Sequence, residues 1–93
     1  MIKSFKSRAL EKLFFEDNRQ KINANHAAKL LRILDRLDAA SSTQDMNLPG
    51  YNLHELKGKQ KGVWAVKVSR NWRITFEFDG KDAIHVDYLD YHS

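Results

Sequence analysis

The sequence contains no cysteine, a single proline and four glycines among its 93 residues. Without cysteine the chain can form neither a disulfide framework nor a thiolate metal site, and this absence fits a reducing compartment. No apolar run reaches the length of a signal peptide or of a membrane-spanning helix. We therefore expect a cytoplasmic protein that makes no membrane contact and is stabilised by an ordinary hydrophobic core.

The composition that remains is that of a globular protein, with 42% hydrophobic and 30% charged residues. A chain of 93 residues supports one modest core and is too short for two, so residues 1–93 are expected to form one domain. The net charge of +4 is uneven, because residues 54–73 carry six basic side chains and only one acidic side chain. Such a basic segment is typical of a surface that binds a phosphate-rich partner, although a merely solvated face has the same composition.

The first forty residues show the periodicity of two helices. Ser7 is a plausible N-cap for a short helix that ends near Glu16. The apolar positions of this helix are Leu10, Leu13 and Phe14. A second helix is expected after a cap at Asn23 or Asn25. Its core-facing stripe follows the spacing i, i+3, i+4, i+7, i+10 and consists of Ala27, Leu30, Leu31, Leu34 and Leu37.

From Tyr51 onward the apolar period changes to two, which predicts strands over residues 51–56, 64–69, 72–78 and 84–88. Residues 2–6 could add an edge strand, and Asp79-Gly80 is a hairpin signal. The core-facing strand positions are Trp64, Val66, Val68, Trp72, Ile74, Phe76, Phe78, Ile84, Val86 and Tyr88. The predicted fold class is α+β, a compact antiparallel β-sheet with the two N-terminal helices packed against one face.

The strand period places Arg73 on the face opposite its neighbours Trp72 and Ile74, which are expected in the core. A rigid strand that holds an arginine in this way is suited to binding an anion. The alternative is an exposed strand arginine that forms an ion pair with Glu77 or Asp87.

A basic loop over residues 56–62 precedes these strands. Lys57, Lys59 and Lys61 could follow the phosphates of a nucleic acid, and Gly58 and Gly62 allow tight backbone turns. The pattern is not a P-loop, because no Gly-Lys-Ser/Thr sequence opens a helix. A lysine-rich hairpin loop that serves only solubility would have the same sequence.

The last residues, Asp90, Tyr91 and His92, combine a carboxylate, an aromatic ring and a group that titrates near neutral pH. An aromatic side chain can stack on an unpaired base, and His92 or His54 could transfer a proton. Both could equally be ordinary surface histidines, and a metal site formed by His54, Asp90 and His92 has no recognised ligand spacing. Two further histidines look structural, His26 and His85.

Taken together, four stretches resemble the HigB toxins of the RelE superfamily, ribosome-dependent mRNA interferases of bacterial toxin–antitoxin modules. These stretches are Ile2-Lys3-Ser4-Phe5, Leu53-His54-Glu55-Leu56-Lys57-Gly58, Asn71-Trp72-Arg73-Ile74-Thr75-Phe76 and Asp90-Tyr91-His92. The resemblance extends over essentially the whole chain. It implies a compact antiparallel sheet flanked by helices, in agreement with the periodicity.

The resemblance also implies a reaction, the cleavage of mRNA in the ribosomal decoding site without metal or cofactor. The ribose 2′-hydroxyl attacks the adjacent phosphate and leaves a 2′,3′-cyclic phosphate and a free 5′-hydroxyl. The implied active site consists of His54, Lys57, Arg73, Asp90, Tyr91 and His92. The implied RNA contacts are Lys57, Lys59, Lys61, Arg73 and Tyr91.

The residue types suit this reaction. Arg73 and Lys57 would stabilise the negative charge that builds up on the phosphorus oxygens in the transition state. His92 would transfer a proton, and His54 would be either the second proton-transfer group or a phosphate ligand. Which histidine is the base and which the acid stays open at this point.

Tyr91 would stack on or position the base at the scissile bond, and Asp90 would orient His92 or a nearby cation. Relatives often carry an arginine in the basic loop where this chain has Lys59-Gln60-Lys61. Lysine supplies the charge but not the bidentate geometry of arginine. This difference bears on any specific contact from the loop and leaves its general electrostatic role unchanged.

The implied partners are a HigA-type helix-turn-helix antitoxin, the small ribosomal subunit at its decoding site, and mRNA. Operator DNA would be reached only through the antitoxin complex. Two other functions remain as alternatives, a non-catalytic protein that binds RNA or the ribosome and blocks translation, and a metal-dependent hydrolase.

Overall fold

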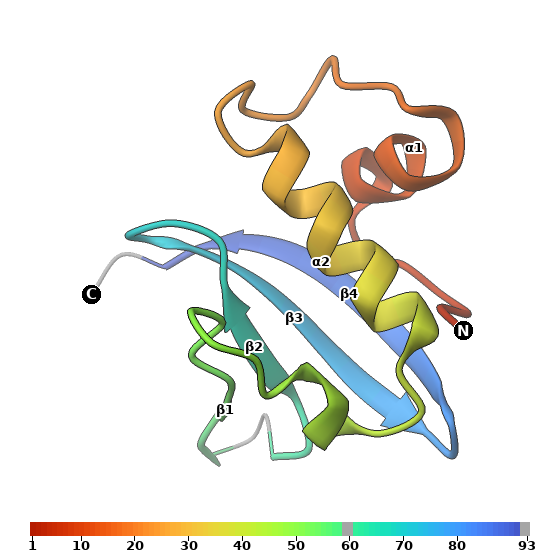
Figure 1. The fold of residues 1–93 in the computed structure, drawn as a ribbon, viewed down its shortest axis with the longest axis vertical. Helices are drawn as coiled ribbons and strands as arrows, with labels where there is room; N and C mark the ends of the chain where they lie inside the picture. Colours follow the sequence, from red (N-terminus) through yellow and green to blue (C-terminus); the bar gives the residue numbers. More distant parts are fainter. Residues whose placement is uncertain (59–60, 92–93) are drawn as a thin grey trace.

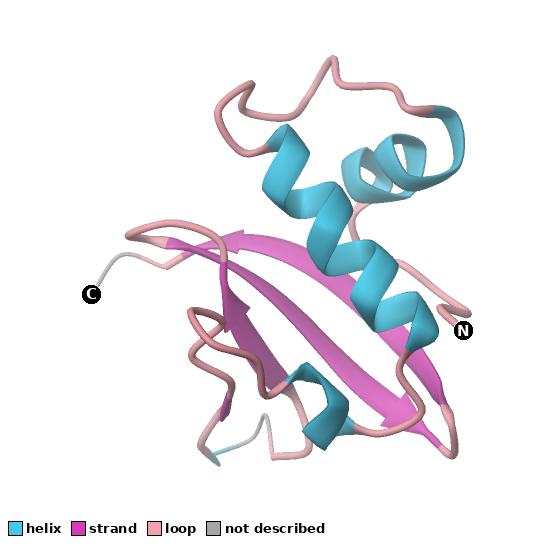
Figure 2. Cartoon of the chain, in the orientation of Figure 1, coloured by secondary structure: helices cyan, strands magenta, loops and turns pink. Residues whose placement is uncertain are grey.

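A computed structural model describes residues 1–58 and 61–91 of the chain. Its elements are α1 (Arg8–Glu16), α2 (Ala27–Ala39), the 3-10 helix η1 (Thr43–Met46), β1 (His54–Glu55), β2 (Trp64–Lys67), β3 (Trp72–Asp79) and β4 (Asp82–Asp90). The strands form one antiparallel sheet in the order β1-β2-β3-β4. Figure 1 shows α2 lying across β3 and β4, with α1 packed beside α2. Figure 2 shows the helical first half and the strand-rich second half of the chain. The predicted α+β class is confirmed.

Helix α1 begins and ends as local chemistry predicts. The hydroxyl of Ser7 accepts a hydrogen bond from the backbone N–H of Leu10 at 3.1 Å, which satisfies one of the donors left free at a helix start. Asp17 then adopts a left-handed conformation with φ 53°, and its N–H donates to the carbonyl of Leu13 at 3.1 Å. The predicted cap and end of this helix are confirmed.

Helix α2 begins later than the predicted asparagine caps. His26 is the residue before the helix, and its side chain forms no capping hydrogen bond. The side-chain oxygen of Asn23 instead accepts from the N–H of Asn25 at 2.9 Å, which makes a turn that precedes the helix. The predicted cap was therefore wrong. The predicted stripe also needs a correction, since Ile33 is fully buried while Leu31 is only partly buried.

A β-bulge in β4 changes which side chains reach the core. The register between β3 and β4 shifts between Thr75 and Glu77, and His85, in the bulge, has a φ of 55°. Ala83 is therefore fully buried, whereas Ile84 pairs with Glu77 and is only partly buried. The prediction that Ile84 faces the core was wrong, because one extra residue reverses the side-chain alternation. The predicted hairpin is confirmed by the pairing of Asp79 with Asp82.

The first two predicted strands, over residues 2–6 and 51–56, are less extensive in the structure than expected. Residues 2–6 make two isolated parallel bridges to β4, Ile2 to Ala83 and Phe5 to Val86, and not a continuous strand. β1 is limited to two residues and does not extend over 51–56. Asn52 has a φ of 49°, and this left-handed conformation interrupts the extended backbone before β1.

The core fills the space between the helices and one face of the sheet. Its fully buried side chains include Leu10, Leu13, Leu30, Ile33, Leu34, Leu37, Val66, Ile74, Phe76 and Val86. The opposite face, here called the helix-free face, carries His54, Ala65, Lys67, Arg73, Thr75, Asp87 and Leu89. Within the described residues, no helix is both long enough and apolar enough to span a membrane.

Candidate active site

The strand registers define how the candidate residues lie on the helix-free face. One row across the sheet runs from His54 through Ala65 and Thr75 to Asp87. The next row places Arg73 between Lys67 and Leu89. Paired residues point to the same side of a sheet, and so do residues two apart along one strand. Arg73 therefore lies on the face away from the core, as its sequence neighbours predicted.

Arg73 is held by the turn that joins β2 to β3. Its Nη1 atom donates to the carbonyl of Ser69 at 2.9 Å and to that of Trp72 at 3.0 Å. The alternative of an ion pair with Glu77 or Asp87 is wrong. Glu77 contacts His85 at 2.7 Å, and Asp87 accepts from the N–H of Tyr88 at 2.9 Å. The guanidinium is thus positioned by backbone carbonyls, and no carboxylate among the described residues neutralises it.

Lys67 is a candidate that the sequence alone did not single out. It is exposed and lies directly opposite Arg73, so two cations face each other across neighbouring strands. Like charges in this arrangement destabilise a sheet. The ion pairs that the described residues form include neither of the two. A bound phosphate between them would relieve this repulsion.

The C-terminal end of β4 reaches the same turn. The N–H of Tyr91 donates to the carbonyl of Asn71 at 2.6 Å. Asp90 pairs with Trp72, whose ring packs against the core, so the Asp90 side chain leaves the sheet on the helix side. Figure 1 shows the turn between β2 and β3 on the same side of the molecule as the end of β4. His92 lies outside the described residues.

An aromatic layer under this end of the sheet fixes β3 and β4 to α2. The ring of Trp72 stacks on that of Tyr88 with a centroid distance of 4.4 Å. The hydroxyl of Tyr88 lies 2.5 Å from Nδ1 of His26, which is buried, in keeping with its structural assignment. Burial and, secondly, the charge of Asp90 raise the pKa of Tyr88 above its ordinary value of 10.0. Tyr88 is therefore a neutral hydrogen-bonding group at physiological pH.

One ring nitrogen of His54 is hydrogen-bonded to the backbone. Its Nδ1 lies 2.9 Å from the carbonyl oxygen of Asn52. A carbonyl can only accept, so Nδ1 must donate, and the neutral ring then carries its lone pair on Nε2. This tautomer suits a general base or a hydrogen-bond acceptor.

The basic loop lies at the other end of β2 from Arg73. Lys57 and Lys61 are both exposed there, whereas Lys59 lies outside the described residues. A hollow of about 350 Å³ opens on the helix-free face between the loop and β4, and its cations are Lys6 and Lys61. The predicted residues thus form two groups, Arg73 with the end of β4 and the lysines of the loop. His54 lies between these groups on the edge strand.

The described residues contain no group of three or more histidines and carboxylates that could hold a metal ion. Of the ligand set in the metal alternative, His54 lies on β1 and Asp90 lies at the end of β4 on the helix side. These two do not converge on one point. The third member, His92, lies outside the described residues.

Comparison with known proteins then decides the family. A model of the HigB-like toxins, described as RelE-like toxins of type II toxin–antitoxin systems, matches residues 3–92. The chain belongs to this family. It is 39% identical to Endoribonuclease HigB of Proteus vulgaris over 92 residues, which cover 99% of this chain and 100% of that protein. It is 32% identical to Toxin HigB-1 of Vibrio cholerae over 94 residues, covering 99% of this chain and 98% of that protein.

Family membership confirms the resemblance seen in the sequence. The protein is a RelE-like toxin of a type II module, a class in which the toxin pairs with an antitoxin. The match includes both groups of candidate residues, because it runs from residue 3 to residue 92.

Proposed function

We propose that this toxin is an endoribonuclease that cleaves mRNA in the ribosomal decoding site and so inhibits translation. The observation that carries the proposal is the pair of cations on the helix-free face, Lys67 and Arg73. Neither is neutralised by a carboxylate of the described chain, and Arg73 is held in place by the turn carbonyls. A relative of full-length similarity carries the name endoribonuclease, which supports the same function.

In the proposed reaction the ribose 2′-oxygen attacks the adjacent phosphorus in line with the 5′-oxygen that leaves. The 2′-hydroxyl gives its proton to Nε2 of His54, the nitrogen that the Asn52 carbonyl leaves unprotonated. The bond from phosphorus to the 5′-oxygen breaks, and that oxygen takes a proton from His92. The products are a 2′,3′-cyclic phosphate and a free 5′-hydroxyl.

The cations have the role of stabilising charge. Arg73 and Lys67 would bind the phosphorus oxygens, whose negative charge increases in the transition state. Lys57 would contribute from the loop and contact the RNA there together with Lys59 and Lys61. Tyr91 would stack on a neighbouring base, and Asp90 would orient His92 or a cation close to it.

The toxin is proposed to act in the cytoplasm without metal or cofactor. A HigA-type helix-turn-helix antitoxin would neutralise it. The toxin reaches operator DNA only through the antitoxin complex, which represses the shared operon. The antitoxin pairing follows from the family, and its helix-turn-helix type is part of this proposal.

The test is an analysis of the message after the purified toxin has acted on translating ribosomes. We expect fragments that end in a 2′,3′-cyclic phosphate and begin with a 5′-hydroxyl. Inhibited translation with full-length message would instead indicate a non-catalytic ribosome-binding protein. Cleavage of ribosome-free RNA that a chelator abolishes would indicate a metal-dependent hydrolase, and the proposal would fail.

A further inference from the structure

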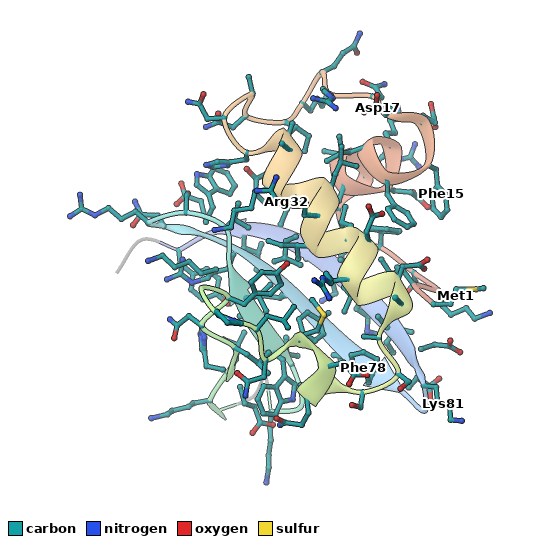
Figure 3. All side chains as sticks on the ribbon, viewed as in Figure 1. Met1, Phe15, Asp17, Arg32, Phe78 and Lys81 are labelled. Atoms are coloured by element: carbon teal, nitrogen blue, oxygen red, sulfur yellow. The ribbon has the colours of Figure 1, made fainter. Side chains whose placement is uncertain are left out.

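The outer surface of α1 carries the most exposed large apolar side chain of the described chain. Phe15 is 64% exposed, and Met1, at 60%, is the other large hydrophobic residue of this kind among residues 1–58 and 61–91. Figure 3 shows Phe15 projecting from α1 at the margin of the molecule opposite the turn between β2 and β3. Exposed apolar surface of this kind is costly in water unless a partner covers it.

Phe15 is held in position although it is exposed. Its ring contacts those of Phe5 and Phe14 at centroid distances of 5.9 Å and 5.1 Å, and Phe5 and Phe14 contact each other at 6.0 Å. The three rings restrict one another, so binding through Phe15 costs little side-chain entropy. Rigid aromatic side chains with these properties are frequent anchors at protein interfaces.

A basic pocket lies on the same helix. It has a volume of about 90 Å³ between α1 and the following loop, and its charged lining residues are Arg8, Lys12 and Lys21. Arg8 is the first residue of the helix, where a cation opposes the helix dipole. Arg8 and Lys12 are also one helical turn apart, a spacing at which like charges destabilise a helix. A carboxylate bound in the pocket would offset both effects.

Helical spacing brings the pocket and the aromatic anchor together. Residues 8, 12 and 15 follow the pattern i, i+4, i+7 and therefore share one face of α1. We propose that this α1 surface, defined by Arg8, Lys12, Phe15 and Lys21, is the docking surface for the antitoxin. The antitoxin segment that fits it presents an apolar side chain to Phe15 and a neighbouring acidic side chain to the basic pocket.

The charges around Phe15 favour a protein over RNA as the occupant. Glu11 and Glu16 are exposed on either side of Phe15 and would repel a phosphate backbone. The proposed RNA site around Arg73 lies on the opposite face of the sheet. The inference rests on the family's pairing with an antitoxin and is independent of RNA cleavage.

The test measures the affinity of the full-length toxin for the purified antitoxin encoded in the same operon, without ribosomes or RNA. Phe15→Ala is expected to weaken binding by about 30-fold or more, as truncation of an aromatic anchor does. Lys12→Glu is expected to weaken binding by about 10-fold or more and to make the affinity less sensitive to salt. Lys81→Glu is the matched control, because Lys81 is exposed in the turn between β3 and β4 and should bind the antitoxin as the wild type does.

Thermal unfolding and the circular dichroism spectrum of the toxin without antitoxin establish that each variant is folded. If Phe15→Ala disturbs the aromatic cluster, Lys12→Glu still decides the question, since Lys12 is exposed on α1. Antitoxin affinities within about threefold of wild type for both variants would overturn the proposal. Normal antitoxin affinity of Lys12→Glu together with weakened ribosome binding would overturn it too, and would assign the surface to RNA.

Discussion

At the scale of single residues, Arg73 is distinguished from the other cations by the way the backbone holds it. Three carbonyls of the turn from Ser69 to Trp72 accept from one of its terminal nitrogens, at distances from 2.9 to 3.4 Å. A guanidinium with a fixed position needs little reorganisation when charge develops on a phosphate. Lys67, the lysine opposite Arg73 on the helix-free face, forms no side-chain hydrogen bond with the described residues.

Replacement of Arg73 should therefore affect cleavage more than stability. Arg73→Ala is expected to lower the cleavage rate by about 10²–10³, the usual loss when one stabilising donor is removed from a transition state. Arg73→Lys should retain part of the rate, because lysine supplies a charge without the planar fork. Single-turnover cleavage of ribosome-bound mRNA measures both.

The control for Arg73 is Lys81→Ala, which removes the same charge from the exposed turn between β3 and β4. It should cleave at the wild-type rate. An equal loss of activity in both variants would show that only the net charge matters, and the assignment of Arg73 would be wrong.

The assignment of His92 as a proton-transfer group rests on the sequence alone. The structure does not contribute to it, because His92 lies outside the described residues. His92→Ala is expected to slow cleavage by about 10²–10⁴, the range for loss of a general acid or base, while the fold persists. His85→Asn is a suitable histidine control, since asparagine tolerates the left-handed conformation at that position. A normal cleavage rate in His92→Ala would remove His92 from the mechanism.

At the scale of elements, the quality of prediction depended on whether the determining interaction is local. The start of α1 was predictable because the Ser7 cap bonds to Leu10, three residues away. The start of α2 was not, because Asn23 uses its side chain in a turn before the helix. The bulge in β4 could not be foreseen either, because its left-handed residue is His85 and no glycine marks it.

The contact between α2 and the end of β4 makes a prediction about stability. Tyr88→Phe removes the hydroxyl that contacts His26 at 2.5 Å and leaves a buried ring nitrogen without its partner. We expect a loss of about 1–3 kcal/mol in the free energy of unfolding. Urea unfolding at neutral pH measures this loss. Tyr51→Phe is the control, since the Tyr51 hydroxyl forms no hydrogen bond with the described part of the chain.

The same tyrosine makes a prediction about alkaline pH. Burial raises the pKa of Tyr88 in the folded protein above 10.0, so the folded state keeps its proton at a pH where the unfolded chain loses it. This contribution to stability is fully present below about pH 10 and is lost as the pH rises through the folded pKa. The wild type should therefore lose more stability than Tyr88→Phe between about pH 8 and pH 11. Equal losses of stability in the two proteins would show that folding does not raise the pKa of the Tyr88 phenol.

At the scale of the whole molecule, the two sides of the sheet have different tasks. The helices cover one face and enclose the core against it, which leaves Arg73, Lys67 and His54 on the other face. The α1 surface belongs to the helix layer on the other side of the sheet. This separation predicts that variants can lose RNA cleavage while they keep antitoxin binding, and the reverse.

The sequence predicted part of this arrangement. Period two was enough to place Arg73 on the helix-free face, because side-chain direction in a strand alternates with every residue. The position of Lys67 opposite Arg73 was not predictable, because the register depends on the geometry of the turn over residues 68–71. The same holds for Asp90, which leaves the sheet on the helix side only through its pairing with Trp72.

The measurement that tests the central claim most directly is the mapping of mRNA ends after the toxin is mixed with translating ribosomes and, separately, with naked message. The wild type is expected to produce discrete cuts in the reading frame on the ribosome only, and Arg73→Ala should produce them far more slowly. Cuts on naked RNA at the same rate would contradict the dependence on the ribosome. Intact message in both reactions, with translation still inhibited, would contradict the claim that the helix-free face is a catalytic surface.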